Sequence, residues 1–257
     1  MAESETRVRQ LPATIQQVVE RLDEIIDESR QENSRLGYFP ALYREVTIKV
    51  QEGVAGGDFE DGARMERLDV IFANRYLEAY EQYRNGREPT RSWQIALASA
   101  RRWRLLIIQH LLLGMNAHIN LDLGIAAART NPGENIASLK SDFHKINEIL
   151  ADLLGVVQDK INALSPAMGL LDKVGGRSDE AIMNFSMQKA RDEAWKFATA
   201  LAVLPEDEQQ AKIAEKDEKI ALLANIVRNP GWLVNLFAFL IRILETSNVR
   251  KVINVLF

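Results

Sequence analysis

The sequence predicts an all-α protein that folds as a single bundle-like domain over residues 1–257. Apolar residues recur at the 3.6-residue period of an amphipathic helix through most of the chain. Alternating apolar and polar runs, which are typical of strands, are nearly absent. The sequence contains neither an internal repeat nor a long linker, so a second domain is not expected.

Proline and glycine residues separate the periodic segments and predict where helices begin and end. Gly37 ends the first helix, Pro40 and Pro89 begin the second and fourth, and Gly114 is the weak point of the fourth. A loop rich in Gly and Asp precedes the third helix and is predicted to be an exposed turn. These signals predict four helices in the first half of the chain: residues 11–36, 40–54, 63–83 and 89–114.

The second half of the chain shows the same alternation of periodic segments and breakers. Ser138 and Ser178 are suited to cap helix N-termini, because a side-chain oxygen there accepts a free backbone N–H. Pro205 and Pro230 mark further interruptions. The predicted segments are residues 116–128, 138–164, 179–204 and 206–228, followed by the apolar C-terminal residues 230–257. We expect this last segment to pack on the body of the protein, and a peripheral membrane contact is the alternative.

The composition argues against several classes of function. The net charge of −4 indicates no basic surface of the kind that binds nucleic acid. The absence of cysteine excludes disulfides, thiolate zinc sites and cysteine nucleophiles. The polar N-terminus lacks the apolar core of a secretion signal, and no apolar run is long enough to span a membrane, so a cytoplasmic location is expected.

All three histidines lie in one region of the chain, and two of them precede an acid by four residues: His118 precedes Asp122, and His144 precedes Glu148. Residues i and i+4 share one face of a helix, so each pair can present an imidazole and a carboxylate to one point. Two such pairs on neighbouring helices predict a metal site with nitrogen and oxygen ligands, with zinc favoured and iron or manganese as alternatives. The same pattern also fits core histidines that carboxylates orient.

His110 is a further predicted ligand, eight residues before His118. The two residues would lie about 12 Å apart along a straight helix. Either the chain kinks at Gly114, which lies midway between them, and both histidines share a metal, or His110 belongs to a second position.

A helix around residues 69–75 adds polar candidates to the site. Asp69 could supply another metal ligand, and either Asp69 or Glu148 is expected to act as the general base. Arg75 is expected either to bind an anionic group of the substrate or to form an internal salt bridge. The residues expected to orient the substrate are Asn74, Asn116 and Asn120.

Three strings of the sequence, LDVIFANRYLEAY, HLLLGMNAHINLDL and ARDEAW, resemble a bacterial family that is catalogued only as a domain of unknown function. The resemblance covers roughly residues 35–200. It implies membership of an uncharacterised family and implies no particular activity.

The two His–acid pairs are also similar to the His-x3-Asp and His-x3-Glu pairs of zinc-dependent phospholipase C and related single-strand nucleases. The resemblance implies a helical fold with zinc held between helices, and His110 belongs to the segment similar to their first motif. Gly114 stands where an acid would follow His110. Those enzymes also use a mature N-terminal residue as a zinc ligand, whereas this chain begins with Met1. The resemblance therefore implies one or two metal ions rather than three.

These observations favour a metal-dependent hydrolase, in which a metal-bound water attacks a small apolar or lipid-like ester or phosphoester. A non-haem iron oxygenase is one alternative, although the Glu-x-x-His pairs of di-iron bundles do not occur in the chain. The other alternative is a metal-free binding or biosynthetic protein with an apolar cavity. Its histidines would serve as acids, bases or hydrogen-bonding groups.

Overall fold

The computed structural model describes residues 10–165, 167 and 187–257. Its regular elements are helices, and no strand occurs among the residues described, which confirms the predicted all-α class. Short 3-10 turns, Arg35–Gly37 and Gly133–Leu139, and a π-helical turn, His118–Asp122, lie between α-helices. The α-helices are α1 (Ile15–Gln31), α2 (Tyr38–Gly56), α3 (Gly62–Arg84), α4 (Arg91–Ser99), α5 (Ile107–Ala117), α6 (Leu123–Thr130), α7 (Lys140–Leu164), α10 (Met187–Ala202), α11 (Glu206–Arg228), α12 (Trp232–Leu244) and α13 (Val249–Leu256).

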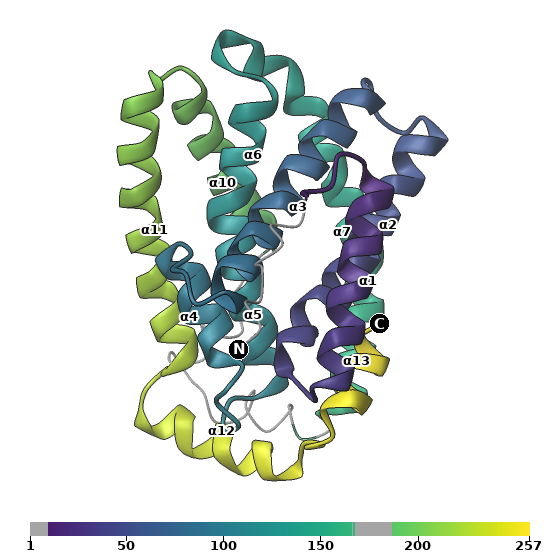
Figure 1. Cartoon of the computed structure of the whole chain (residues 1–257), viewed down its shortest axis with the longest axis vertical. Coiled ribbons are helices and arrows are strands. Elements are labelled where there is room, and N and C mark those ends of the chain that lie inside the picture. The colour runs from purple at the N-terminus through teal and green to yellow at the C-terminus, as the bar shows by residue number, and fades with distance from the viewer. Residues whose placement is uncertain (1–9, 166, 168–186) are drawn as a thin grey trace, which may run out of the picture.

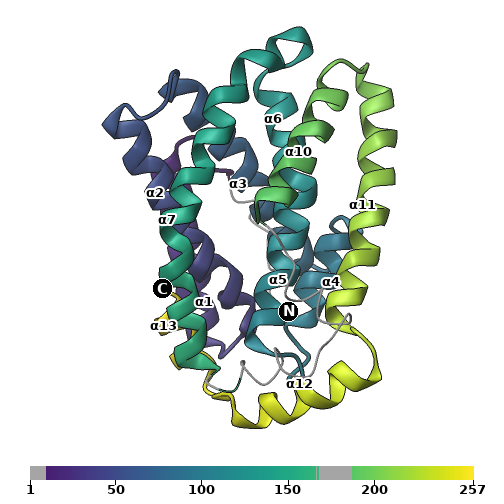
Figure 2. The same cartoon turned by 180° about the vertical axis from the view of Figure 1, so that it is seen from behind.

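Most of these helices run along the length of an elongated bundle, whereas α12 lies across one end (Figures 1 and 2). Helices α5 and α6 occupy the middle, where α2, α3, α4, α10 and α11 pack around them. Helix α1 packs along α2. The C-terminal helix α13 packs on α1, α2 and α7 through a set of buried apolar side chains: Val249, Val252, Ile253 and Leu256.

Helix α1 follows directly from its local sequence. The side chain of Thr14 accepts a hydrogen bond from the Gln17 N–H at 3.2 Å and caps the first turn. The helix ends at Gln31 rather than at the predicted residue 36, and Asn33 then adopts a left-handed backbone conformation with φ of 54°. Its buried apolar stripe, which has the predicted period, consists of Ile15, Val18, Val19, Leu22, Ile25 and Ile26.

The prediction of one helix over residues 89–114 is wrong, because α4 and α5 are separated by residues 100–106. Three arginines in this break, Arg101, Arg102 and Arg104, are exposed. The break lets α4 turn back and pack beside α5, and both helices also pack on α11. The periodicity of the apolar residues on either side does not reveal this tertiary contact.

Helices α5 and α6 form one stretch, Ile107–Thr130, since only the π-helical turn separates them. This stretch departs from α-helical geometry at His118–Asp122 and not at Gly114, so the predicted alternative of a kink at Gly114 is wrong. The stretch is long and apolar enough to cross a membrane, but 83% of its most apolar window is buried inside the protein, as in a core helix. Among the other described helices, α11 and α12 meet that criterion only together, and they bend by 61°.

Gly114 allows close packing between α5 and α2. A Cβ atom at this position would lie 2.5 Å from Cδ2 of Phe39, which is closer than packed side chains approach. The absence of a side chain at Gly114 therefore sets the position of the Phe39 ring.

We expect Gly114→Ala to lower the free energy of unfolding by about 1–3 kcal/mol, because Phe39 or the backbone must move to accommodate the methyl group. Urea unfolding would measure the change. Gly155→Ala in α7 is a matched control, because no atom lies within 4 Å of its added Cβ. Alanine also favours a helix over glycine by about 1 kcal/mol. Equal stability of the two variants would contradict the packing role of Gly114.

Candidate functional site

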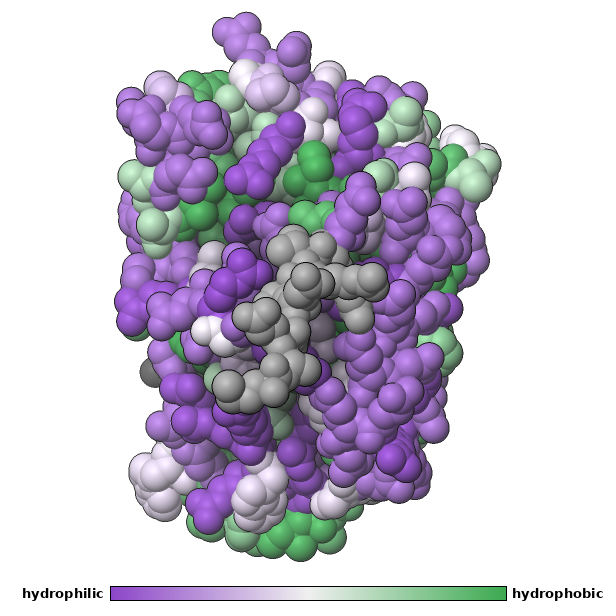
Figure 3. Space-filling model, in the orientation of Figure 1, coloured by the Kyte–Doolittle hydropathy of each residue, from purple (hydrophilic) through white to green (hydrophobic). Residues whose placement is uncertain are grey.

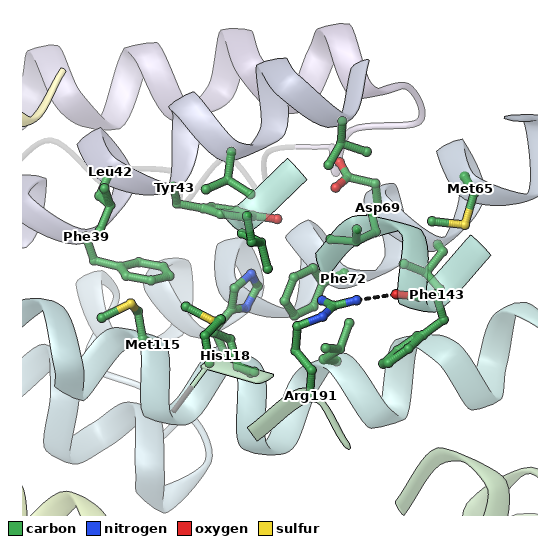
Figure 4. Close-up of a pocket in the computed structure, with 18 residues that line it drawn as sticks. Phe39, Leu42, Tyr43, Met65, Asp69, Phe72, Met115, His118, Phe143 and Arg191 are labelled. Carbon is green, nitrogen blue, oxygen red and sulfur yellow. Dashed lines mark hydrogen bonds between the residues drawn. The ribbon is translucent and has the colours of Figure 1, made fainter. Parts of the chain in front are cut away.

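An apolar pocket lies inside the bundle between α2, α3, α7, α10 and the α5–α6 stretch (Figure 4). The helices line it with side chains three or four residues apart, which is the spacing of one helix face. The space between these side chains, counted together with its opening to solvent, is about 740 Å³. The apolar walls consist of Phe39, Leu42, Val46, Val50, Met65, Leu68, Phe72, Met115, Ile119, Leu123, Phe143, Ile146, Leu150 and Met187.

Four lining residues bring polar groups to these walls: Tyr43, Asp69, His118 and Arg191. The hydroxyl of Tyr43, Oδ2 of Asp69 and Nε2 of His118 are buried and have no hydrogen-bond partner among the described residues. Leaving such a group unpaired costs about 1–3 kcal/mol, so most buried polar groups in native proteins are paired. Three unpaired groups in one pocket indicate a place where a ligand or water supplies the missing hydrogen bonds.

His118 is a neutral side chain with one free acceptor. Its ring stacks on Phe72 with the centroids 3.6 Å apart and meets the Tyr43 ring edge-on. Burial lowers the pKa of His118, and the hydrogen bond to Asp122 opposes this shift only in part. Nδ1 lies 3.5 Å from Oδ2 of Asp122. Because an ionised carboxylate only accepts hydrogen bonds, we assign the proton to Nδ1, which leaves Nε2 as an acceptor.

The environment of Asp69 and Tyr43 favours their neutral forms. Burial raises the pKa of Asp69 to about 7, and the nearby charge of Glu66 adds to the shift. Burial also raises the pKa of Tyr43 well above its ordinary value, with a further contribution from Asp69. A neutral carboxyl group both donates and accepts, and a phenol donates through its O–H. The pocket therefore offers donors as well as acceptors.

Arg191 on α10 brings a buried guanidinium to the pocket. Its Nη2 donates to the Phe143 carbonyl, and its Nε donates to Oδ1 of Asn147 (Figure 4 shows the first of these bonds). The guanidinium lies over the Phe143 ring, 4.7 Å from its centroid. Burial lowers the pKa of Arg191 to about 10, and no carboxylate of the described residues forms an ion pair with it. The pocket therefore has a positive charge that its own side chains do not neutralise.

The carboxylate of Asp122 is fully buried and has two partners besides His118. Oδ1 accepts a hydrogen bond from Nε of Arg75 at 3.1 Å, and Oδ2 accepts one from Nε1 of Trp93 at 2.7 Å. Arg75 thus forms the internal salt bridge that was one of its two predicted roles. These bonds connect α3 and α4 to the π-helical turn beside the pocket. Such turns within α-helices are frequent at functional sites.

The second histidine–acid pair lies outside the pocket. His144 on α7 is half-buried against the rings of Phe143 and Trp195. The Glu148 side chain is 69% exposed and pairs with Lys145 at 2.5 Å. Neither member of this pair lines the pocket.

His110 occupies a third environment, separate from both His118 and His144. Its ring meets Tyr38 edge-on with the centroids 5.7 Å apart. Burial, with the charges of Arg35 and Arg242, lowers the pKa of His110 to about 3. The described part of the chain contains no group of three or more His, Asp or Glu side chains that could hold a metal ion. It therefore does not gather the five predicted ligands, His110, His118, Asp122, His144 and Glu148, into one cluster.

The three candidate asparagines bind the backbone or each other. Asn74 donates to the Pro12 carbonyl at 2.9 Å, and Asn116 donates to the Ile220 carbonyl at 3.0 Å. Asn120 donates to Asn116 at 3.1 Å. None of the three lines the pocket, and of the candidates predicted from the sequence only Asp69 and His118 do.

Sequence reasoning missed Tyr43, Phe72 and Arg191. Arg191 had a recognisable signal, because it lies on the apolar face of α10 between Ala190 and Ala194, where a charge needs a reason. Tyr43 and Phe72 had none, since aromatic residues on an apolar helix face usually belong to the core.

We expect Asp69 to make stability depend on pH. Its folded pKa lies above its unfolded value, so the folded chain retains a proton that the unfolded chain releases. The free energy of unfolding of the wild type should therefore fall relative to Asp69→Asn between about pH 4 and pH 7, by up to about 4 kcal/mol. Urea unfolding of both proteins across this range would measure the difference.

The comparison between these two proteins isolates Asp69. His118 has a lowered folded pKa, so its contribution rises with pH and opposes that of Asp69, but both proteins contain it. A stability difference that does not change with pH would show that the Asp69 carboxyl group titrates normally.

Residues 15–230 match a family described as a Family of unknown function (DUF5995). The matched range includes every residue that lines the pocket. No curated protein and no solved structure is significantly similar to the chain. Because the match covers most of the 257 residues, the chain belongs to this family of unknown function, in agreement with the resemblance to an uncharacterised family.

Proposed function

We propose that this protein binds a small, mainly apolar molecule in the pocket, with the polar end of that molecule at Tyr43, Asp69 and His118. The observation that carries the proposal is the gathering of three unpartnered buried polar atoms in one apolar pocket. The walls would stabilise the apolar part of the ligand by removing it from water. This proposal corresponds to the metal-free binding protein among the alternatives from the sequence.

The polar groups define which ligands fit. The O–H of Tyr43 and a neutral Asp69 can donate to the ligand, and Nε2 of His118 can accept from it. The charge of Arg191, which no described carboxylate neutralises, disfavours a cationic ligand in a pocket of low polarity. A hydroxyl or a carboxylic acid at the end of an aliphatic chain satisfies these conditions, so dodecanol and dodecanoic acid are suitable probes.

Tyr43→Phe should weaken binding of these probes by roughly three- to tenfold, because it removes one hydrogen bond to the ligand. Isothermal titration calorimetry would measure the affinity. The variant should be at least as stable as the wild type, since it deletes a buried hydroxyl that has no partner in the unliganded protein.

Tyr76→Phe is the matched control for this experiment. The Tyr76 hydroxyl is also buried and unpartnered, but Tyr76 does not line the pocket. Its removal should leave probe binding unchanged. Absence of saturable binding to the wild type, or an equal loss of affinity in both variants, would contradict the proposal.

A metal-dependent hydrolase, with an iron oxygenase as its alternative, is a separate proposal from the sequence. Two observations favour this proposal over a purely structural role for the histidines. His118 lies beside Asp122, and Asp69 lines the same pocket as His118. If instead the pocket binds without metal, protein purified without a histidine tag should contain no stoichiometric zinc, iron or manganese. EDTA should then leave the affinity for dodecanol unchanged. Elemental analysis that finds one metal ion per chain would favour the hydrolase over the binding protein.

A further inference from the structure

Helix α12 exposes an apolar face at one end of the molecule. Its opposite face, formed by Val234, Ala238 and Ile241, is buried against the bundle. Trp232 is 79% exposed and Ile243 is 60% exposed, which is unusual for side chains of this size and polarity. Figure 3 shows apolar residues gathered at this end of the molecule. The exposed face follows the period of a helix and includes Trp232, Leu233, Leu236, Leu240, Ile243 and Leu244.

Helix α12 and the groove beside it carry positive charges, and the nearest acid in the sequence, Glu245 directly after α12, is buried and bonded to Ser165 and the Ile107 N–H. The sequence has no Asp or Glu in residues 89–121 or in residues 219–244, although the whole chain has a net charge of −4. Arg102, Arg104 and Arg228 line a groove beside α12, and no described residue forms an ion pair with any of them.

Arg102 lies close enough to Arg228 for its charge to change the pKa of Arg228. Burial lowers the pKa of Arg228, and the positive charge of Arg102 lowers it further. Arg242 connects this groove to α12, because its buried side chain donates to the Trp103 carbonyl at 2.6 Å. The groove and the apolar face are therefore parts of one continuous surface, with the exposed Trp103 ring between them and edge-on to Phe239.

We infer that this end of the protein binds the surface of a membrane that contains anionic phospholipids. An amphipathic helix that lies in the plane of the interface buries its apolar face at the boundary of the acyl chains. Arginines beside it bind lipid phosphates, and tryptophans favour the headgroup region. The face of α12, the three arginines of the groove, Trp103 and Trp232 match these requirements together.

The charge distribution favours a membrane over a second copy of the chain. A symmetric dimer through α12 would bring the like-charged arginine grooves of both copies to one interface, which is unfavourable. Anionic lipids supply the opposite charge. This inference concerns a surface outside the ligand pocket and does not depend on the proposed function.

Co-sedimentation of the full chain with vesicles tests the inference. The wild type should bind vesicles of phosphatidylcholine with phosphatidylglycerol more tightly than vesicles of phosphatidylcholine alone, and added salt should weaken binding. Arg102→Gln and Arg228→Gln should each lower the partition coefficient by about fivefold. Leu236→Gln and Ile243→Gln should lower it as well, because both side chains belong to the exposed face.

Two exposed residues away from this surface provide matched controls. The turn between α10 and α11, which contains Val203, lies at the end of the molecule opposite α12 (Figure 1). Arg129 is in the last turn of α6. Val203→Gln and Arg129→Gln should leave vesicle binding unchanged. Failure of the wild type to bind anionic vesicles, or equal losses in the control variants, would overturn the inference.

Two further measurements distinguish other occupants of this surface. Sedimentation equilibrium that shows a dimer, dissociated by Ile243→Gln, would assign the face to a second copy and overturn the inference. Saturable binding of glycerol phosphate without binding to vesicles would assign the groove to a soluble anion, with the same consequence.

Discussion

The buried carboxylate of Asp122 is the interaction on which the surroundings of the pocket depend. It binds Arg75 from α3 and Trp93 from α4 and lies beside Nδ1 of His118. A buried charge is tolerated only when partners replace its hydration, so these contacts hold three segments at a defined spacing. The carboxylate also orients the imidazole and leaves Nε2 free. The free acceptor that His118 brings to the pocket thus depends on the carboxylate of Asp122, which does not line the pocket.

The protein uses apolar side chains in two different ways. In the pocket they surround a few polar atoms that their neighbours leave unpaired, which is the arrangement expected of a small-molecule site. On α12 they face outward beside unpaired arginines, which suits an interface that is apolar on one side and anionic on the other. The two features are chemically compatible, since molecules that fit an apolar pocket also partition into bilayers.

Much of the fold could be predicted because the residues that form, cap and end a helix are close to one another in the sequence. The stripe of α1, the capping oxygen of Thr14 and the prolines before α4 and α11 are all visible in the sequence. The break between α4 and α5 was missed, because apolar residues flank it on both sides and the packing of α4 beside α5 is a tertiary contact. Of the candidate site, Asp69 and His118 could be identified as ionisable residues among apolar ones.

The sequence by itself determined the helical class, the positions of most helices and the i, i+4 spacing between two of the three histidines and an acid. Only the tertiary structure decided that the first pair belongs to a buried network beside the pocket, whereas Glu148 pairs with Lys145 at the surface. It also selected Tyr43 and Arg191 as lining residues. The physical reason is that periodicity defines a face of a helix but not the neighbour toward which that face turns, which is set by packing among helices distant in sequence.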